Sequence, residues 1–169
     1  MILVYAFSNR WSTNISSRTL LDLQRSSDQS KNITFQKIFF HPNQFFQRHI
    51  KNKNYSLIIG LGDFFGQLQR IKIETQAKNQ YGKKNISPSS PFSLKLSLPL
   101  LTDVDKSKFL LSSNMGIYNC NWIAYQTQLY LNQKHPQTKH IFFHLPKKQK
   151  PLFLSKSIFD LLTTNQMLK

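Results

Sequence analysis

Cysteine, acidic residues and long apolar runs are all scarce in this chain. The 169 residues include one cysteine, which excludes an intramolecular disulfide and a zinc site built from several cysteines. No apolar run reaches the length that a membrane-spanning helix requires. The apolar stretch at residues 2–7 has no basic region before it, so we expect a cytoplasmic protein with no membrane span.

The shortage of acids leaves a large excess of positive charge. The sequence has 23 lysines and arginines against 7 acidic residues, a formal net charge of +16. Such an excess favours contact with nucleic acid or an anionic surface when it is concentrated. Here it is scattered, with short clusters only at 83–84 and 147–150. The pattern favours a basic, solvated surface, and binding to nucleic acid or another anionic surface stays the alternative.

The apolar content predicts one globular domain over residues 1–169. Hydrophobic residues make up 40% of the chain and aromatic residues 13%. Apolar runs alternate with helical patterns, which indicates an α/β fold around a largely parallel sheet. We expect a third strand near 56–59 that ends in a sharp bend at the glycines of 60–62. Residues 76–99, rich in Lys, Asn, Ser and Pro, predict a long excursion that contains a hairpin.

Cys120 lies at the predicted start of a helix that ends near residue 134. Unpaired N–H groups at a helix N-terminus lower the pKa of a thiol and favour the nucleophilic thiolate. The alternative is an inert core cysteine, because free cysteine is among the most buried residue types.

His144 and Glu74 are the side chains that could activate such a thiol. His144 follows the apolar strand 141–143, and a neutral imidazole there could accept the thiol proton. Glu74, the only glutamate, could orient that imidazole. The alternatives are a packed neutral histidine and a salt bridge from Glu74 to a lysine. A metal site at His140 and His144 lacks a third ligand with recognisable spacing.

Two segments resemble a known family of cysteine peptidases. Residues 113–121, Ser-Asn-Met-Gly-Ile-Tyr-Asn-Cys-Asn, resemble the nucleophile segment of pyroglutamyl peptidase I, also called pyrrolidone carboxyl peptidase. Residues 140–146, His-Ile-Phe-Phe-His-Leu-Pro, are similar to the histidine segment of that family. The first strand at 2–7, the glycines at 58–62 and the Ile-Glu pair at 73–74 extend the resemblance over nearly the whole chain.

The resemblance implies a fold, an activity and a mechanism. The fold is a single three-layer α/β/α domain with a twisted, mostly parallel sheet, assembled as a homo-oligomer, dimer or tetramer. The activity is removal of an N-terminal pyroglutamyl residue from peptides whose N-terminus is blocked. Cys120, His144 and Glu74 would form the catalytic triad, with neither metal nor organic cofactor.

The resemblance also indicates a substrate pocket, in which this chain departs from the family. The expected pocket residues are Phe7, Trp11, Lys84, Tyr118 and Asn119. Trp11 would replace a second phenylalanine, and Asn119 stands where the family has valine. Lys84 lies near the position of an arginine, and lysine lacks its planar donor fork. Two alternatives stay open, which are the same fold and triad with another amide substrate, and a catalytically inactive basic binding protein.

Overall fold

Six strands form one sheet in the computed structural model, which describes residues 1–27 and 32–168. The strand order is β2-β1-β3-β8-β4-β7. The first four strands are parallel neighbours, namely β2 (Ile33–Ile38), β1 (Ile2–Phe7), β3 (Leu57–Phe64) and β8 (Lys139–Pro146). β4 (Ile71–Glu74) runs antiparallel to β8 and parallel to the edge strand β7 (Phe109–Ser112). The predicted α/β fold with a mostly parallel sheet is therefore confirmed.

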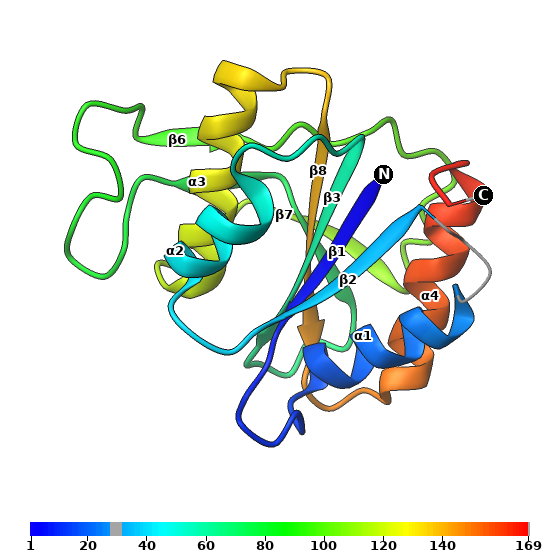
Figure 1. Ribbon diagram of the computed structural model, residues 1–169. Coiled ribbons are helices and arrows are strands. Elements are labelled where there is room, and N and C mark those ends of the chain that lie inside the picture. Colours follow the sequence, from blue (N-terminus) through cyan, green and yellow to red (C-terminus); the bar gives the residue numbers. More distant parts are fainter. Residues whose placement is uncertain (28–31, 169) are drawn as a thin grey trace.

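Helices cover both faces of this sheet (Figure 1). One face carries α1 (Ile15–Ser26) and α4 (Pro151–Thr164), and the other carries α2 (Pro42–Phe45), a π-helical turn (Phe46–Ile50) and α3 (Asn119–Lys134). The molecule thus has the three layers that the family resemblance implied. Among the described residues, no helix is both long and apolar enough to cross a membrane.

The inner strands bury side chains on both faces, as strands of a parallel sheet between helices do. Val4 on β1 and Ile59 on β3 belong to the core cluster under α1 and α4. Their neighbours Leu3 and Ile58 belong to the cluster under α3. Because side chains alternate along a strand, alternate residues of β1, β3 and β8 line the α3 face.

The predicted hairpin lies outside the main sheet. β5 (Gln76–Lys78) and β6 (Ser93–Lys95) pair antiparallel as a separate two-stranded sheet. Figure 1 shows the chain between them extending beyond α3. The hairpin contacts α3, so it supports the helix that begins next to Cys120.

The expected bend at the glycines is wrong, because β3 continues through them to Phe64. A Cβ atom on Gly60 would meet the ring of Phe142 and lie 2.7 Å from the Tyr5 hydroxyl oxygen. A Cβ atom on Gly62 would lie 2.7 Å from the Cys120 sulfur. The two glycines therefore make room for side chains above the strand, and they do not turn the chain.

Candidate active site

The side chains of the candidate site stand in two rows across the α3 face of the sheet. Tyr5, Gly60, Phe142 and Glu74 are successive Cα partners on β1, β3, β8 and β4. In the next row, Gly62 on β3 is the Cα partner of His144 on β8. Since the glycines occupy the β3 positions of both rows, the sheet has a hollow there that other side chains fill.

His144 and Glu74 form a buried pair. The imidazole Nδ1 lies 2.7 Å from the Glu74 Oε1 oxygen, across the antiparallel β4–β8 pairing. Glu74 is fully buried and His144 is 5% exposed. A carboxylate that accepts from Nδ1–H leaves Nε2 unprotonated in the neutral ring, and this atom can then accept a proton. The pair has the arrangement of a base and its orienting group.

Cys120 reaches the same place from the helix above. It is the second residue of α3, which begins at Asn119 as the sequence predicted. The thiol lies over Gly62, the strand partner of His144, so sulfur and imidazole are neighbours on one face. In the described part of the chain, residues 1–27 and 32–168, no hydrogen bond joins the Cys120 thiol and the His144 imidazole. Catalytic hydrogen bonds are often long before substrate binds.

The expectation of a lowered thiol pKa is wrong. Burial, the negative charge of Asp63 and that of Glu74 raise the pKa of Cys120 to about 12. A hydrogen bond from its own backbone N–H acts in the other direction but is the weakest of these influences. The thiol is therefore protonated at neutral pH, and a base must remove its proton before attack.

The first turn of α3 supplies, beside the sulfur, hydrogen-bond donors that have no partner within the helix. The first bond of the helix runs from the Trp122 N–H to the Tyr118 carbonyl oxygen at 2.8 Å. The N–H groups of Asn119, Cys120 and Asn121 precede it, so they have no partner within the helix. Such donors can stabilise an oxyanion that develops on a carbonyl attacked by Cys120.

Asn121 holds this first turn in place, a role that the sequence analysis did not assign. Its side chain is fully buried, and Oδ1 accepts from the Lys78 N–H at 2.8 Å. Its Nδ2 donates to the Lys78 carbonyl at 2.9 Å and the Gln80 carbonyl at 2.6 Å. These bonds attach α3 to β5. The available sequence signal for this role was an asparagine directly after Cys120. The signal for the hollow was the two-residue spacing of Gly60 and Gly62 within an apolar strand.

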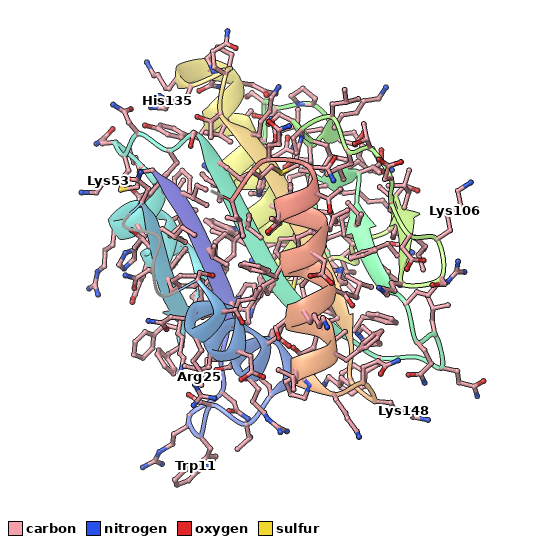
Figure 2. The ribbon with its side chains drawn as sticks, turned by 90° about the vertical axis from the view of Figure 1, so that its right-hand side faces the viewer. Trp11, Arg25, Lys53, Lys106, His135 and Lys148 are labelled. Carbon is pink, nitrogen blue, oxygen red and sulfur yellow. The ribbon has the colours of Figure 1, made fainter. Side chains whose placement is uncertain are left out.

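The predicted pocket residues are only partly gathered around the thiol. Phe7 packs against the same core cluster as Cys120. Trp11 is 73% exposed, and the Arg10 guanidinium lies 5.1 Å from its ring centroid. Figure 2 shows Trp11 pointing away from the body of the molecule. Trp11 therefore makes no second aromatic wall in this conformation.

The other three predicted pocket residues lie on the surface around the start of α3. Tyr118 is 69% exposed, and its ring centroid is 6.5 Å from that of Tyr81. Asn119 is exposed, and its Oδ1 accepts from the Tyr81 hydroxyl at 2.9 Å. Lys84 is exposed and pairs with Tyr81 in an isolated bridge. The Gly82 N–H donates to the Ile117 carbonyl oxygen at 2.8 Å, which ties this turn to the segment before Cys120.

The donor groups near the site do not form a metal cluster. In the part of the chain that the structure describes, no three His, Cys, Asp or Glu side chains gather where they could hold a metal ion. His140, on the same face of β8 as His144, is fully buried, and its Nδ1 lies 3.3 Å from the Gln128 Oε1 oxygen. The titratable side chains that the structure brings together here are the Cys120 thiol, the His144 imidazole and the Glu74 carboxylate.

Three solved peptidase structures share the fold over nearly their whole length. Pyroglutamyl peptidase I from Bacillus amyloliquefaciens has a TM-score of 0.79 and 18% identity, covering 97% of this chain and 93% of that one. Pyrrolidone carboxyl peptidase from Thermococcus litoralis has a TM-score of 0.76 and 16% identity, covering 97% and 91%. That of Fervidobacterium islandicum has a TM-score of 0.73 and 18% identity, covering 98% and 97%. No protein-family model and no curated protein matches the sequence.

Proposed function

We propose that this chain is a divergent member of the pyroglutamyl peptidase I family and hydrolyses the amide bond after an N-terminal pyroglutamyl residue. One observation carries the proposal. The Cys120 sulfur lies over Gly62, the strand partner of His144, and His144 lies 2.7 Å from Glu74. The order of the three residues along the chain and the shared fold support the same family.

The reaction uses the three side chains in sequence. His144 Nε2 accepts the thiol proton, and the Cys120 sulfur then attacks the carbonyl carbon of the scissile amide. Backbone N–H groups of the first turn of α3 stabilise the resulting oxyanion. The imidazolium then gives its proton to the leaving amine, and an acyl-enzyme remains. Water, deprotonated by His144, releases pyroglutamate and restores the thiol. No step draws on a metal ion or an organic cofactor.

Glu74 holds the reactive tautomer through both halves of the cycle. Its carboxylate accepts from His144 Nδ1–H and stabilises the imidazolium that forms when Nε2 is protonated. Because the pKa of Cys120 is raised to about 12, the sulfur becomes a thiolate only when His144 accepts its proton in the substrate complex, immediately before attack. The thiol is expected to stay neutral until substrate is bound.

A fluorogenic pyroglutamyl amide tests the proposal. Wild-type protein should release the fluorophore, and Cys120→Ser should lose almost all of this activity because serine is not activated in a site arranged for sulfur. A matched control is Ser113→Ala, an exposed position before the nucleophile, which should keep the wild-type rate. Equal rates for wild type and Cys120→Ser would refute the assignment of the nucleophile.

A second candidate keeps the triad and changes the substrate. Trp11 is 73% exposed and does not close the pocket beside Phe7. This observation favours an acyl group other than pyroglutamyl. Amides of proline, glutamine, glutamate and acetylated amino acids, assayed beside the pyroglutamyl amide, separate the two candidates. Cleavage of one of these amides by wild type but not by Cys120→Ser, without cleavage of the pyroglutamyl amide, would favour the second.

A further inference from the structure

A phenol group that the proposed reaction does not use is buried beside the nucleophile. Tyr5 is fully buried in β1, and its hydroxyl has no hydrogen-bond partner among the described residues. Buried hydroxyl groups in proteins almost always have a partner, because burying one without a hydrogen bond costs free energy. A phenylalanine would fill the same space without that cost. The hydroxyl therefore calls for a functional explanation.

The surroundings direct this hydroxyl toward the middle of the sheet. Tyr5 and Gly60 are Cα partners, and the hydroxyl oxygen lies 2.7 Å from where a Gly60 Cβ would stand. Two residues further along the same face of β3, the Cys120 sulfur lies 2.7 Å from the equivalent position of Gly62. The Phe142 ring lies against both glycines. The oxygen and the sulfur thus occupy adjacent parts of one hollow.

The aromatic neighbours of Tyr5 offer it no acceptor. Its ring centroid lies 5.2 Å from that of Phe45 and 6.3 Å from that of Phe142. Burial, and then the charge of an ionised Cys120, raise the pKa of Tyr5 well above its usual range. The phenol therefore keeps its proton at neutral pH. It is an O–H donor without an acceptor among the described residues.

The acceptor that this donor lacks is one that catalysis would create. We propose that Tyr5 is a positioning residue whose phenol O–H donates a hydrogen bond to the Cys120 sulfur when that sulfur becomes a thiolate. The thiol proton goes to His144, and Tyr5 keeps its own proton throughout. A hydrogen bond to the ionised form favours that form. The role rests on the proposed function, because only a catalytic cysteine needs to pass through the thiolate.

Alkylation by iodoacetamide tests this role directly, since Cys120 is the only cysteine in the chain. Tyr5→Phe removes one oxygen atom and leaves the apolar contacts in place. The rate constant of alkylation should be lower than that of wild type at each pH between 7 and 9. The rate constant at pH 8 should fall about three- to tenfold, because a smaller thiolate fraction is partly offset by higher nucleophilicity. Thermal stability should be equal to or above that of wild type.

Tyr125→Phe is the matched control. Tyr125 is fully buried in the same core cluster, but its hydroxyl donates to the Pro91 carbonyl oxygen at 2.6 Å. This variant should lose stability and keep the wild-type alkylation profile. An unchanged alkylation rate in Tyr5→Phe would overturn the proposal, whatever the stability of the variant. An equal fall in rate in both variants would overturn it too, because the effect would then belong to packing.

The outcome is independent of the peptidase assay, since alkylation requires no substrate. If wild type cleaves the pyroglutamyl amide and Tyr5→Phe leaves the alkylation rate unchanged, the role of Tyr5 fails and the proposed function stands. If the alkylation rate falls but wild type cleaves no amide, Tyr5 does stabilise the thiolate and the proposed function fails.

Discussion

The Glu74 carboxylate acts on two neighbouring residues in opposite ways. It lies 2.7 Å from His144 Nδ1, where it would orient the imidazole as the proposed base. Its negative charge is also one of the causes that raise the pKa of Cys120. The residue that favours proton transfer to histidine therefore also opposes spontaneous ionisation of the thiol. A neutral replacement should separate the two effects.

Glu74→Gln should make the thiol more reactive and should slow the proposed amide hydrolysis. Removing the charge lowers the pKa of Cys120, so alkylation by iodoacetamide at pH 8 should become faster. Amide hydrolysis should fall by about 10²- to 10⁴-fold, because the imidazolium loses its carboxylate partner. The time course of alkylation measures the reactivity of the thiol, and the fluorogenic amide measures the rate of hydrolysis.

Asp22→Asn removes the same charge far from the site. Asp22 lies on α1, where it pairs with Arg25 at 3.2 Å. The Asp22→Asn variant should leave both the alkylation of Cys120 and amide hydrolysis unchanged. Slower alkylation in Glu74→Gln would contradict the electrostatic account of Cys120.

At the scale of elements, the site depends on how closely α3 approaches β3. The sulfur occupies the space above Gly62, where any side chain would displace it. The Phe142 ring lies 3.1 Å from the same position, so the hollow has no spare volume. The position of α3 on the sheet and the reactivity of Cys120 are therefore coupled.

Gly62→Ala should displace the nucleophile and lower the stability of the fold. The added Cβ would lie 2.7 Å from the sulfur, and overpacking of this kind costs about 1 to 3 kcal/mol. Amide hydrolysis should fall at least about tenfold, because catalysis is sensitive to small displacements of reacting groups. Urea unfolding and the fluorogenic assay test the two effects.

Ala6→Val is the matched control for added volume. Ala6 is fully buried in the cluster on the opposite face of the sheet, under α1 and α4. This variant should lose stability to a similar extent and keep an intact active site. A fully active Gly62→Ala protein would show that the helix can shift without consequence.

The sequence was a good guide to elements and a poorer one to their contacts. The alternation of apolar runs and helical patterns predicted the α/β fold, and the helix beginning next to Cys120 is observed. The bend at residues 60–62 is wrong because glycine can signal either a turn or a close approach. Only the packed fold reveals that Phe142 and Cys120 occupy the space above those glycines.

The pKa of Cys120 could not be predicted from its position in a helix. The helix N-terminus was expected to dominate, and the thiol does lie in the first turn of α3. Burial and the charges of Asp63 and Glu74 outweigh it, and these depend on residues brought in from β3 and β4. The prediction that Trp11 forms a pocket wall is wrong for a similar reason, because sequence order does not determine which way a loop side chain points.

At the scale of the whole molecule, a buried histidine links stability to pH. His140 lies at the β8–α3 interface, and burial lowers its pKa to about 3. In an unfolded chain a histidine has a pKa of about 6.5. Below that pH, residue 140 binds a proton in the unfolded chain but not in the folded chain. Stability is therefore full above about pH 6.5 and is lost as the pH falls toward 3.

His140→Asn should flatten this dependence. Asparagine cannot be protonated, and its amide can still donate to Gln128. Between pH 7.5 and 4.5 the wild-type free energy of unfolding should fall by up to about 2.7 kcal/mol more than that of the variant. Urea unfolding at several pH values measures the difference. Parallel curves for the two proteins would contradict a neutral, buried His140.

The positive charge is also a property of the whole molecule. Arg25, Lys53, Lys106 and Lys148 point outward on different sides (Figure 2). The short cluster at 147–150 partly serves local contacts, since the Lys147 ammonium lies 3.3 Å from the Phe65 ring centroid and 3.9 Å from Asp63 Oδ2. A dispersed charge of this kind favours solubility and general attraction of anions over recognition of one partner.

The alkylation rate of the single thiol can report on the folding of the molecule. A cysteine in an unfolded chain has a pKa of about 8.5, whereas Cys120 in the folded chain has one of about 12. A brief pulse of alkylating reagent near neutral pH during refolding would mark chains in which α3 has not yet docked on β3. Native molecules would be marked more slowly. The extent of alkylation at Cys120 thus reports when α3 packs over the glycines of β3.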